Sequence, residues 1–157
     1  MGISGVLLKK KEKFNFDKLI SDIKIAANSA NIICVDGIEF QKQYYGPYQY
    51  VTLNLRDVEG ETDNDFLIYV YNDICDMIDG MFDFIDAEKN YQQCINIENF
   101  NGCKMLFDFI YEYMKLNLDD IFYDELAWHY TFEQIEEIAK RDEFDLYWAF
   151  KNPTEYI

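Results

Sequence analysis

Hydrophobic and polar residues alternate along much of the first half of the chain, in a pattern that predicts strands. In Tyr48–Arg56, apolar residues occupy every second position, as in a strand with one buried face. Asp57–Asp65 is polar and Phe66–Tyr71 is apolar again, so these two strands are predicted to pair as a hairpin. Three shorter β-prone runs are predicted as further strands: Ile3–Leu8, Ile32–Val35 and Ile38–Phe40. The last two flank Asp36-Gly37, a dipeptide typical of hairpin turns.

The rest of the chain follows the helical period instead. Asn15–Asn28 is predicted as a helix with Asn15 as its N-cap. In Asp73–Ala87, apolar residues fall on one side of a helical wheel and five aspartates fall on the other. Met105–Leu116 shows a similar separation, and Thr131–Gln134 fits a capping box at the start of another helix. A last short turn is predicted over Asp145–Trp148.

Together these segments predict a single α+β domain over residues 1–157. We expect a mainly antiparallel sheet of about five strands, with an N-terminal helix and three or more C-terminal helices packed on it. The helices are predicted to reach the core through eight apolar residues: Phe16, Leu19, Ile23, Met77, Met81, Phe84, Phe107 and Ile110.

Composition and charge narrow the class of protein. Half of the 157 residues are hydrophobic, which excludes intrinsic disorder. No apolar run reaches the ~18 residues of a membrane span, and the first apolar stretch precedes its lysines, the reverse of a signal peptide. The net charge is −16, divided into +3 for residues 1–56 and −19 for residues 57–157. Such a chain repels nucleic acid and anionic membranes and attracts basic partners, so we expect a cytoplasmic protein that binds a basic protein.

The cysteines predict neither disulfides nor a metal centre. They are too far apart in sequence for a zinc motif and contain no C-x-x-C pair, so all four are expected to be reduced: Cys34, Cys75, Cys94 and Cys103. The acidic run after Asp57 has Thr62 where an EF-hand requires glycine and Ile68 where it requires glutamate. A loose Ca²⁺ site there stays open as an alternative, but no cofactor or metal is predicted.

Two groups of carboxylates are the candidate partner-binding residues. The first is a stripe at helical spacing with no lysine or arginine on its face: Asp73, Asp76, Asp79, Asp83 and Asp86. A solvated helix face normally mixes both signs of charge, so the uniform sign favours a partner-facing surface. The second group alternates along the predicted turn: Asp57, Glu59, Glu61, Asp63 and Asp65. A cluster of tyrosines is a weaker candidate, because interfaces favour tyrosine: Tyr44, Tyr45, Tyr48 and Tyr50.

Catalytic residues are not evident in the sequence. His129 is the single histidine and lies between Trp128 and Tyr130, which is typical of a packed imidazole. The chain has no recognisable nucleophile elbow and no glycine-rich phosphate loop. The chain is therefore not expected to be an enzyme.

The C-terminal region carries a resemblance to a known class of proteins. Phe122-Tyr123-Asp124-Glu125, Trp128-His129-Tyr130-Thr131 and the following stretch to Asn152-Pro153 are similar to the tails of some immunity proteins of bacterial polymorphic and contact-dependent toxins. The resemblance covers about thirty residues and implies cytoplasmic expression and a tight complex with one toxin domain, often a nuclease.

The sequence therefore predicts an immunity protein that neutralises a cognate basic toxin domain through an acidic surface. One alternative is a phage-type inhibitor that mimics nucleic acid, such as an anti-CRISPR protein. A metal- or ligand-binding accessory protein and an enzyme centred on His129 are further alternatives.

Overall fold

The fold is described from a computed structural model, which covers residues 3–36, 43–45, 48–71, 82–100, 104–125 and 128–156. Three α-helices lie in these ranges: α1 (Phe16–Ser29), α2 (Lys104–Leu116) and α3 (Phe132–Ala139). The strands are β1 (Ile3–Lys10), β2 (Ile32–Asp36), β3 (Gln43–Tyr45), β4 (Tyr48–Asp57), β5 (Phe66–Tyr71), β6 (Tyr91–Phe100), β7 (Ile121–Asp124) and β8 (His129–Tyr130). Short 3₁₀ turns occupy Lys11–Lys13, Thr62–Asn64, Trp148–Phe150 and Pro153–Tyr156.

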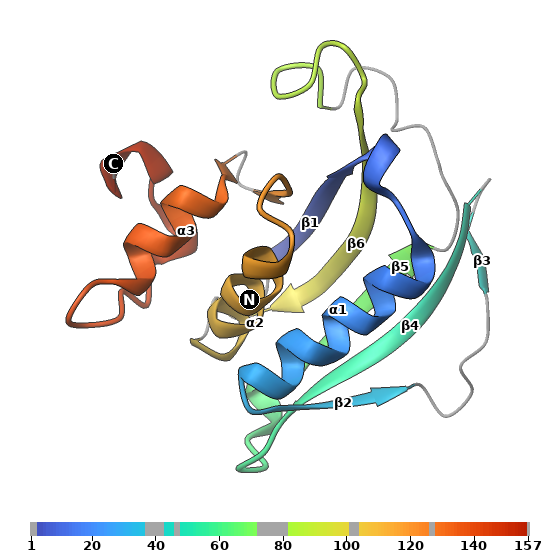
Figure 1. Ribbon diagram of the computed structural model, residues 1–157. Coiled ribbons are helices and arrows are strands. Elements are labelled where there is room, and N and C mark those ends of the chain that lie inside the picture. Colours follow the sequence, from blue (N-terminus) through green and yellow to red (C-terminus); the bar gives the residue numbers. More distant parts are fainter. Residues whose placement is uncertain are drawn as a thin grey trace.

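The strands form one antiparallel sheet in the order β2-β4-β5-β6-β1-β7-β8, and β3 pairs with β4 beside this path. Helices α1 and α2 lie side by side on one face of it, whereas α3 lies outward from α2 (Figure 1). The expectation of about five strands with three or more C-terminal helices is therefore wrong. The described residues form an α+β fold with a larger antiparallel sheet. Of their helices, only α2 and α3 follow the N-terminal helix α1.

The sheet is larger than expected mainly because β6, β7 and β8 were not predicted from the sequence. In β6, Ile95 and Ile97 alternate with Asn96 and Glu98, so the strand has the period of two but few apolar residues outside its centre. β6 pairs with β5 and β1, and this pairing places β1 inside the sheet rather than at an edge. β2 pairs with β4, and the predicted hairpin partner Ile38–Phe40 lies outside the described residues.

The predicted helix Asp73–Ala87 is wrong over its last six residues, 82–87. Residues 73–81 lie outside the described part of the chain, but residues 82–87 form bends and turns rather than a helix. The carboxylate of Asp86 accepts hydrogen bonds from the backbone N–H groups of Asn90 (3.0 Å) and Tyr91 (2.8 Å), just before β6 begins. An aspartate side chain that bonds the backbone in this way competes with helix formation.

Local capping explains where the true helices begin. The side chain of Asn15 accepts a hydrogen bond from the Lys18 N–H at the start of α1. The side chains of Thr131 and Gln134 form the predicted capping box at the start of α3. These polar residues satisfy N–H groups that would otherwise lack a partner in the first helical turn.

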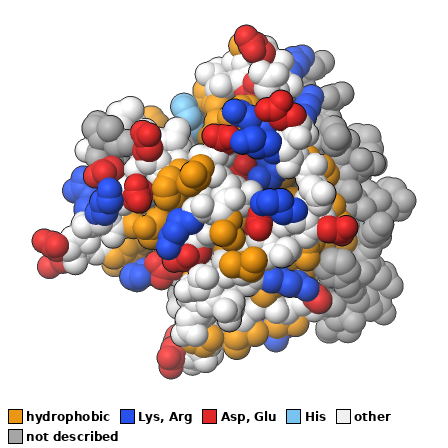
Figure 2. All heavy atoms as spheres, in the orientation of Figure 1, with side chains coloured by type: hydrophobic (Ala, Val, Ile, Leu, Met, Phe, Trp, Pro, Cys, Tyr) orange, Lys and Arg blue, Asp and Glu red, His pale blue; other side chains and the backbone are white. Residues whose placement is uncertain are grey.

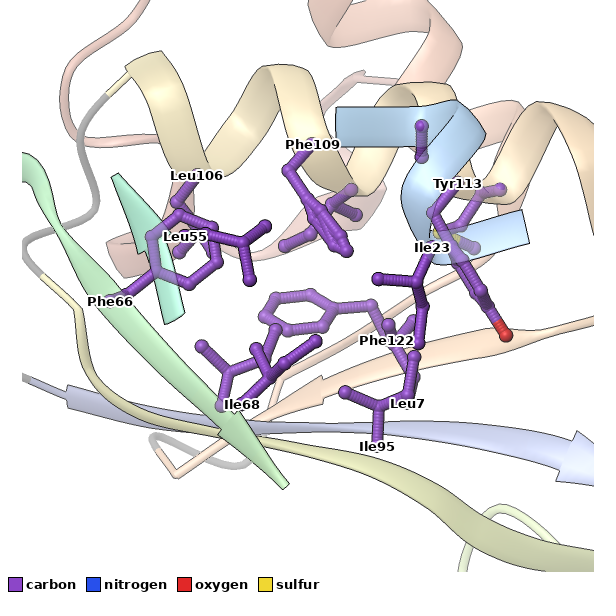
Figure 3. Packing of buried hydrophobic residues seen from close by; sticks show 14 of the residues in the cluster. Leu7, Ile23, Leu55, Phe66, Ile68, Ile95, Leu106, Phe109, Tyr113 and Phe122 are labelled. Carbon is purple, nitrogen blue, oxygen red and sulfur yellow. The ribbon is translucent and has the colours of Figure 1, made fainter. Parts of the chain in front are cut away.

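The hydrophobic core lies between the sheet and the two helices that cover it. Figure 3 shows side chains of α1 and α2 facing those of the strands, with Phe109 above Phe122 and Ile68. Of the eight predicted core residues, four are buried: Leu19, Ile23, Phe107 and Ile110. Phe16 is half-buried at the edge of the core, and Met77 and Met81 lie outside the described residues. Phe84 was predicted wrongly: 59% of it is exposed, because the helix that would have carried it inward does not form there.

Two cysteines fall in the described ranges. Cys34 and Cys94 are thiols and are not in disulfides, as expected, whereas Cys75 and Cys103 lie outside these ranges. The Cys94 thiol donates to the Leu7 carbonyl oxygen at 3.3 Å, which satisfies a polar group in the core. No helix in the described part of the chain has the length and apolar character needed to cross a membrane.

Candidate binding surfaces

Two of the five aspartates in the predicted stripe, Asp83 and Asp86, lie within the described residues. Asp73, Asp76 and Asp79 lie outside the described residues. Asp83 is exposed on the turn before β6, but Asp86 is buried and bonds the backbone of residues 90 and 91. Asp83 and Asp86 therefore do not share one solvent-facing helical face.

The acidic turn between β4 and β5 is fully described, and its carboxylates fall into two groups. Asp57 accepts hydrogen bonds from the Glu59 N–H (2.9 Å) and from the Asn64 side-chain amide (2.7 Å). Asp65 accepts one from the Asp57 N–H at 2.8 Å. The side-chain amide of Asn64, followed by the Glu59 N–H, lowers the pKa of Asp57 because both donors stabilise its charged form.

The other three carboxylates of this turn are exposed: Glu59, Glu61 and Asp63. Gly60, at φ +82°, adopts a left-handed conformation that suits glycine, and a 3₁₀ turn over Thr62–Asn64 follows. Glu59 and Glu61 form no ion pair with any residue that the structure describes. The turn thus holds acidic side chains outward on a backbone fixed by its own hydrogen bonds; we call Glu59, Glu61 and Asp63 the acidic turn.

The two candidate groups lie at opposite ends of the sheet. The β4–β5 turn precedes β5, whereas Asp83 and Asp86 lie in the turn that leads into β6, at the other end of β5 (Figure 1). The six residues of β5 span about 20 Å at the usual rise of a strand. A small partner contact would therefore not use both groups, contrary to the idea that they form one surface.

The single histidine has aromatic neighbours. His129 is half-buried, its ring lies 6.0 Å from that of Phe84, and burial lowers its pKa because desolvation disfavours the charged imidazole. The nearby carboxylate of Asp124 accepts hydrogen bonds from the Trp128 N–H and the Tyr130 hydroxyl. Asp124 thus stabilises the β7–β8 connection.

Of the predicted tyrosine cluster, Tyr50 has a side chain within the described part of the structure. The ring of Tyr50 packs edge-on against Tyr69 and Tyr71, at centroid distances of 5.0 and 6.4 Å. The side chains of Tyr44, Tyr45 and Tyr48 lie outside the described part of the chain.

A buried network of charged groups, which the sequence pattern did not reveal, joins β1 to α2. Lys9 is 5% exposed, and its ammonium group lies 2.8 Å from Asn117 Oδ1 and 2.9 Å from Asp120 Oδ2. The Tyr113 hydroxyl donates to Asp120 at 2.7 Å, and the Asn117 amide reaches Asp22 at 3.3 Å. Burial raises the pKa of Asp120, with Lys9 and Tyr113 acting against this effect.

A cavity of about 510 Å³ opens beside this network. It is lined by lysines, carboxylates and two leucines: Lys9, Lys13, Lys18, Leu116, Asn117, Leu118, Asp119 and Asp120. Figure 2 shows lysine side chains next to carboxylates on this side of the molecule. Lys13 pairs with Asp119 and Lys18 pairs with Asp22, so the positive charges are already matched within the fold.

A second cavity, of about 470 Å³, lies between the end of α1, α2 and the segment after α3. Its lining combines apolar and charged residues: Ser29, Ala30, Asn31, Lys104, Phe107, Asp108, Tyr111, Glu112, Ile138, Ala139, Arg141, Asp142 and Phe144. Figure 2 shows hydrophobic side chains at the surface between the part of the molecule with α3 and the part with α1. We call this cavity the α1–α3 groove.

Three large apolar side chains that follow the groove-lining Phe144 in sequence are exposed. Leu146 is 63% exposed, Tyr147 is 68% and Phe150 is 48%. Between them, Trp148 is fully buried, with its ring 5.2 Å from Phe107. We call Leu146, Tyr147 and Phe150 the apolar knob. Their spacing in sequence does not distinguish them from core residues, so sequence reasoning did not find them.

Comparison of the chain with protein-family models, with curated proteins and with solved structures finds no match in any of the three. Within the described residues, no group of three or more His, Cys, Asp or Glu side chains is arranged to hold a metal ion. The functional argument therefore rests on the charge and shape of the surfaces described above.

Proposed function

We propose that this chain is a binding protein that neutralises a basic protein, and that it acts as an immunity protein for a cognate toxin domain of the nuclease class. The observation that carries the proposal is the acidic turn. Two of the five carboxylates between β4 and β5 fix the backbone, and this leaves Glu59, Glu61 and Asp63 exposed.

A rigid acidic turn favours a basic partner for two reasons. Its charges are part of the −19 of residues 57–157, whose long-range field steers cationic surfaces toward the chain. Because the turn is fixed before binding, little conformational entropy is lost when its side chains meet lysines or arginines. A nuclease has such a cationic groove for its phosphate substrate, and covering that groove would block the enzyme.

Several other carboxylates of the chain are buried, which supports the choice of the acidic turn. Asp86, Asp120 and Asp124 are buried and bonded within the fold, so they are not available to a partner. Fewer carboxylates are therefore exposed than the sequence suggests, and the three carboxylates of the acidic turn are among the exposed ones.

The test begins by capturing the partner from the native host with the tagged chain and identifying it by mass spectrometry. The purified partner is then bound to three variants that each remove three negative charges. These are E59Q/E61Q/D63N in the acidic turn, D76N/D79N/D83N in the predicted stripe, and E12Q/D17N/E155Q at scattered exposed positions. Association rates are measured at low and high salt.

We expect the acidic-turn variant to associate about tenfold more slowly at low salt and to lose much of its salt dependence. The variant with scattered substitutions should associate only slightly more slowly, because its net charge is reduced. A larger effect in the stripe variant would move the interface to the other end of the sheet. Capture of no basic protein, or a captured protein whose activity the chain does not inhibit, would contradict the proposed function itself.

A further inference from the structure

We propose that the outer edge of β2 binds a β-strand of the basic partner, which extends the sheet by one strand; this inference rests on the proposed function. β2 is the first strand in the sheet order and pairs with β4 along one side. Along its other side, no strand in the described part of the chain pairs with it. An edge strand presents alternate N–H and C=O groups that can bond a strand of another chain.

The other edge strands of the sheet offer less backbone to a partner. β8 ends the sheet on the far side and has two residues, and β3, beside β4, has three. β2 has five residues and contains neither proline nor lysine, the residues with which natural edge strands prevent pairing. Of the described edges, β2 is therefore the one that can accept a strand over the greatest length.

The side chains of β2 are apolar on both faces of the sheet. Ile32 is 6% exposed and belongs to the core, and the half-buried Cys34 packs against the same core. Ile33 and Val35 alternate with them and therefore lie on the opposite face, where Ile33 is 46% exposed. An antiparallel strand with one solvated face normally carries polar residues on that face. Apolar residues there favour a partner that covers this edge.

The pairing register places the acidic turn at one end of β2. Ile32, the first residue of β2, is opposite Asp57, the last residue of β4. Glu59 follows two residues later, with its N–H bonded to the Asp57 carboxylate. Figure 1 shows the connection from β4 to β5 beside the start of β2. A strand bound along β2 would therefore end next to the acidic turn.

The charges along this edge are predominantly negative. Residues 32–36 and 48–65, which comprise β2, β4 and the following turn, carry six carboxylates and one arginine. That arginine, Arg56, is opposite Ile33. Lys24 of α1 lies 3.5 Å from Asp36 and adds a second cation. Six carboxylates against two cations leave a net charge of −4.

This charge favours a basic partner over a second copy of the chain. Two copies joined through their β2 edges would bring two such negative regions together, and like charges repel. A partner strand flanked by lysines or arginines would instead meet carboxylates at both ends of β2. The acidic turn then attracts the partner, and the backbone hydrogen bonds of β2 hold it in register.

The experiment measures amide hydrogen exchange of single residues by NMR, in the free chain and in its complex with the purified partner identified by the capture described above. In the free chain, the β2 amides that bond to β4 should exchange slowly, and the alternate amides, which point outward, should exchange fast. In the complex, we expect the outward amides of β2 to exchange at least about tenfold more slowly, because they gain backbone acceptors.

A pair of variants tests the side chains of the same edge. Ile33→Thr removes apolar surface but keeps the β-branched shape that strands favour. Leu118→Thr is the control, because Leu118 is 61% exposed and lies just before β7, five strands from β2 in the sheet order. The dissociation constant should rise about five- to tenfold for Ile33→Thr and not measurably for Leu118→Thr. Thermal melts confirm that both variants fold.

The outcomes separate this inference from the proposed function. Unchanged exchange of the β2 amides in the complex, or unchanged affinity of Ile33→Thr, would overturn the β2 contact. Slow association by the acidic-turn variant would in that case leave the proposed function standing. Slow exchange of every β2 amide in the dilute free chain would mean that the chain itself covers the edge, and slowing with chain concentration would identify a second copy; either result overturns the inference. Capture of no basic protein would overturn both proposals.

Discussion

Carboxylates at the two ends of the sheet have opposite environments. Where β1 ends and β6 begins, Asp120 is 3% exposed and Asp86 is 6% exposed, and both are hydrogen-bonded within the fold. In the turn between β4 and β5, Glu59 and Glu61 are exposed on a backbone that Asp57 holds in place. The same residue types therefore stabilise the fold at positions such as Asp86 and Asp120 and carry surface charge at positions such as Glu59 and Glu61.

This difference shows why a count of acidic residues is a poor guide to a binding surface. An isolated buried carboxylate is unfavourable, so Asp120 is surrounded by Lys9 and Tyr113 and contributes little to the external field. An exposed carboxylate is screened at short range by water but still attracts a cationic partner. The net charge of −16 includes both kinds.

The largest expected effect is at the buried end. Asp120→Ala leaves the Lys9 ammonium group buried without its carboxylate, and breaking a buried pair in this way typically costs about 3–5 kcal/mol. Urea unfolding should show this loss in the free energy of unfolding. In the double variant Lys9→Met/Asp120→Leu, most of the stability should return, because no buried charge is left unpaired. A loss below about 1 kcal/mol for Asp120→Ala would mean that water reaches Lys9 and that the two ends differ less than proposed.

A smaller loss is expected for Asp86→Ala. The substitution removes the charged acceptor for the N–H groups of Asn90 and Tyr91 at the start of β6, and a hydrogen bond to a charged group typically contributes about 1.5–3 kcal/mol. Asp83→Ala is the matched control, because Asp83 lies in the same turn and is exposed. Equal effects of the two substitutions on the free energy of unfolding would show that Asp86 does not act as a capping group.

The same contrast explains how far the sequence predicted the structure. Its successes are local: Asn15 and Thr131 cap helices as expected, and the alternation in Tyr48–Arg56 marks a true strand. The spacing of five aspartates predicted a helix because a wheel records only side-chain polarity. It does not record that Asp86 can bond the backbone four and five residues later and favour a turn.

The candidate site was predictable only as far as composition allowed. The alternating acids of the β4–β5 turn were visible in the sequence, but which of them face solvent depends on hydrogen bonds to Asn64 and to two backbone N–H groups. The buried pair of Lys9 and Asp120 joins residues 111 positions apart, and no local pattern reports such a contact. The apolar knob was missed because exposure of an apolar residue is a tertiary property.

The pKa values of Asp57 and Asp120 should shift in opposite directions, with opposite effects on stability. Hydrogen bonds from Asn64 and Glu59 lower the pKa of Asp57, so its contribution to stability is present above its ordinary pKa of 3.8 and is lost as the pH falls through the lower folded value. Burial raises the pKa of Asp120, so its contribution is present below 3.8 and is lost as the pH rises through the higher folded value. Carboxyl ¹³C titration by NMR should resolve the two groups. A single common pKa for both would remove the distinction between the two ends.

The smallest effect on stability is expected in the β4–β5 turn. Substitutions there distinguish carboxylates that hold the backbone from carboxylates that only carry exposed charge. Glu61→Gln should change the free energy of unfolding by no more than about 0.5 kcal/mol, as is usual for surface positions. Asp65→Ala should instead speed hydrogen exchange of the Asp57 amide, because that N–H loses its acceptor at 2.8 Å. The two variants remove the same charge from the same turn, so net charge alone cannot account for a difference between them. Equal exchange rates at the Asp57 amide in both variants would show that the turn is not held by Asp65, and the acidic side chains would then meet a partner from a backbone that is not fixed in advance.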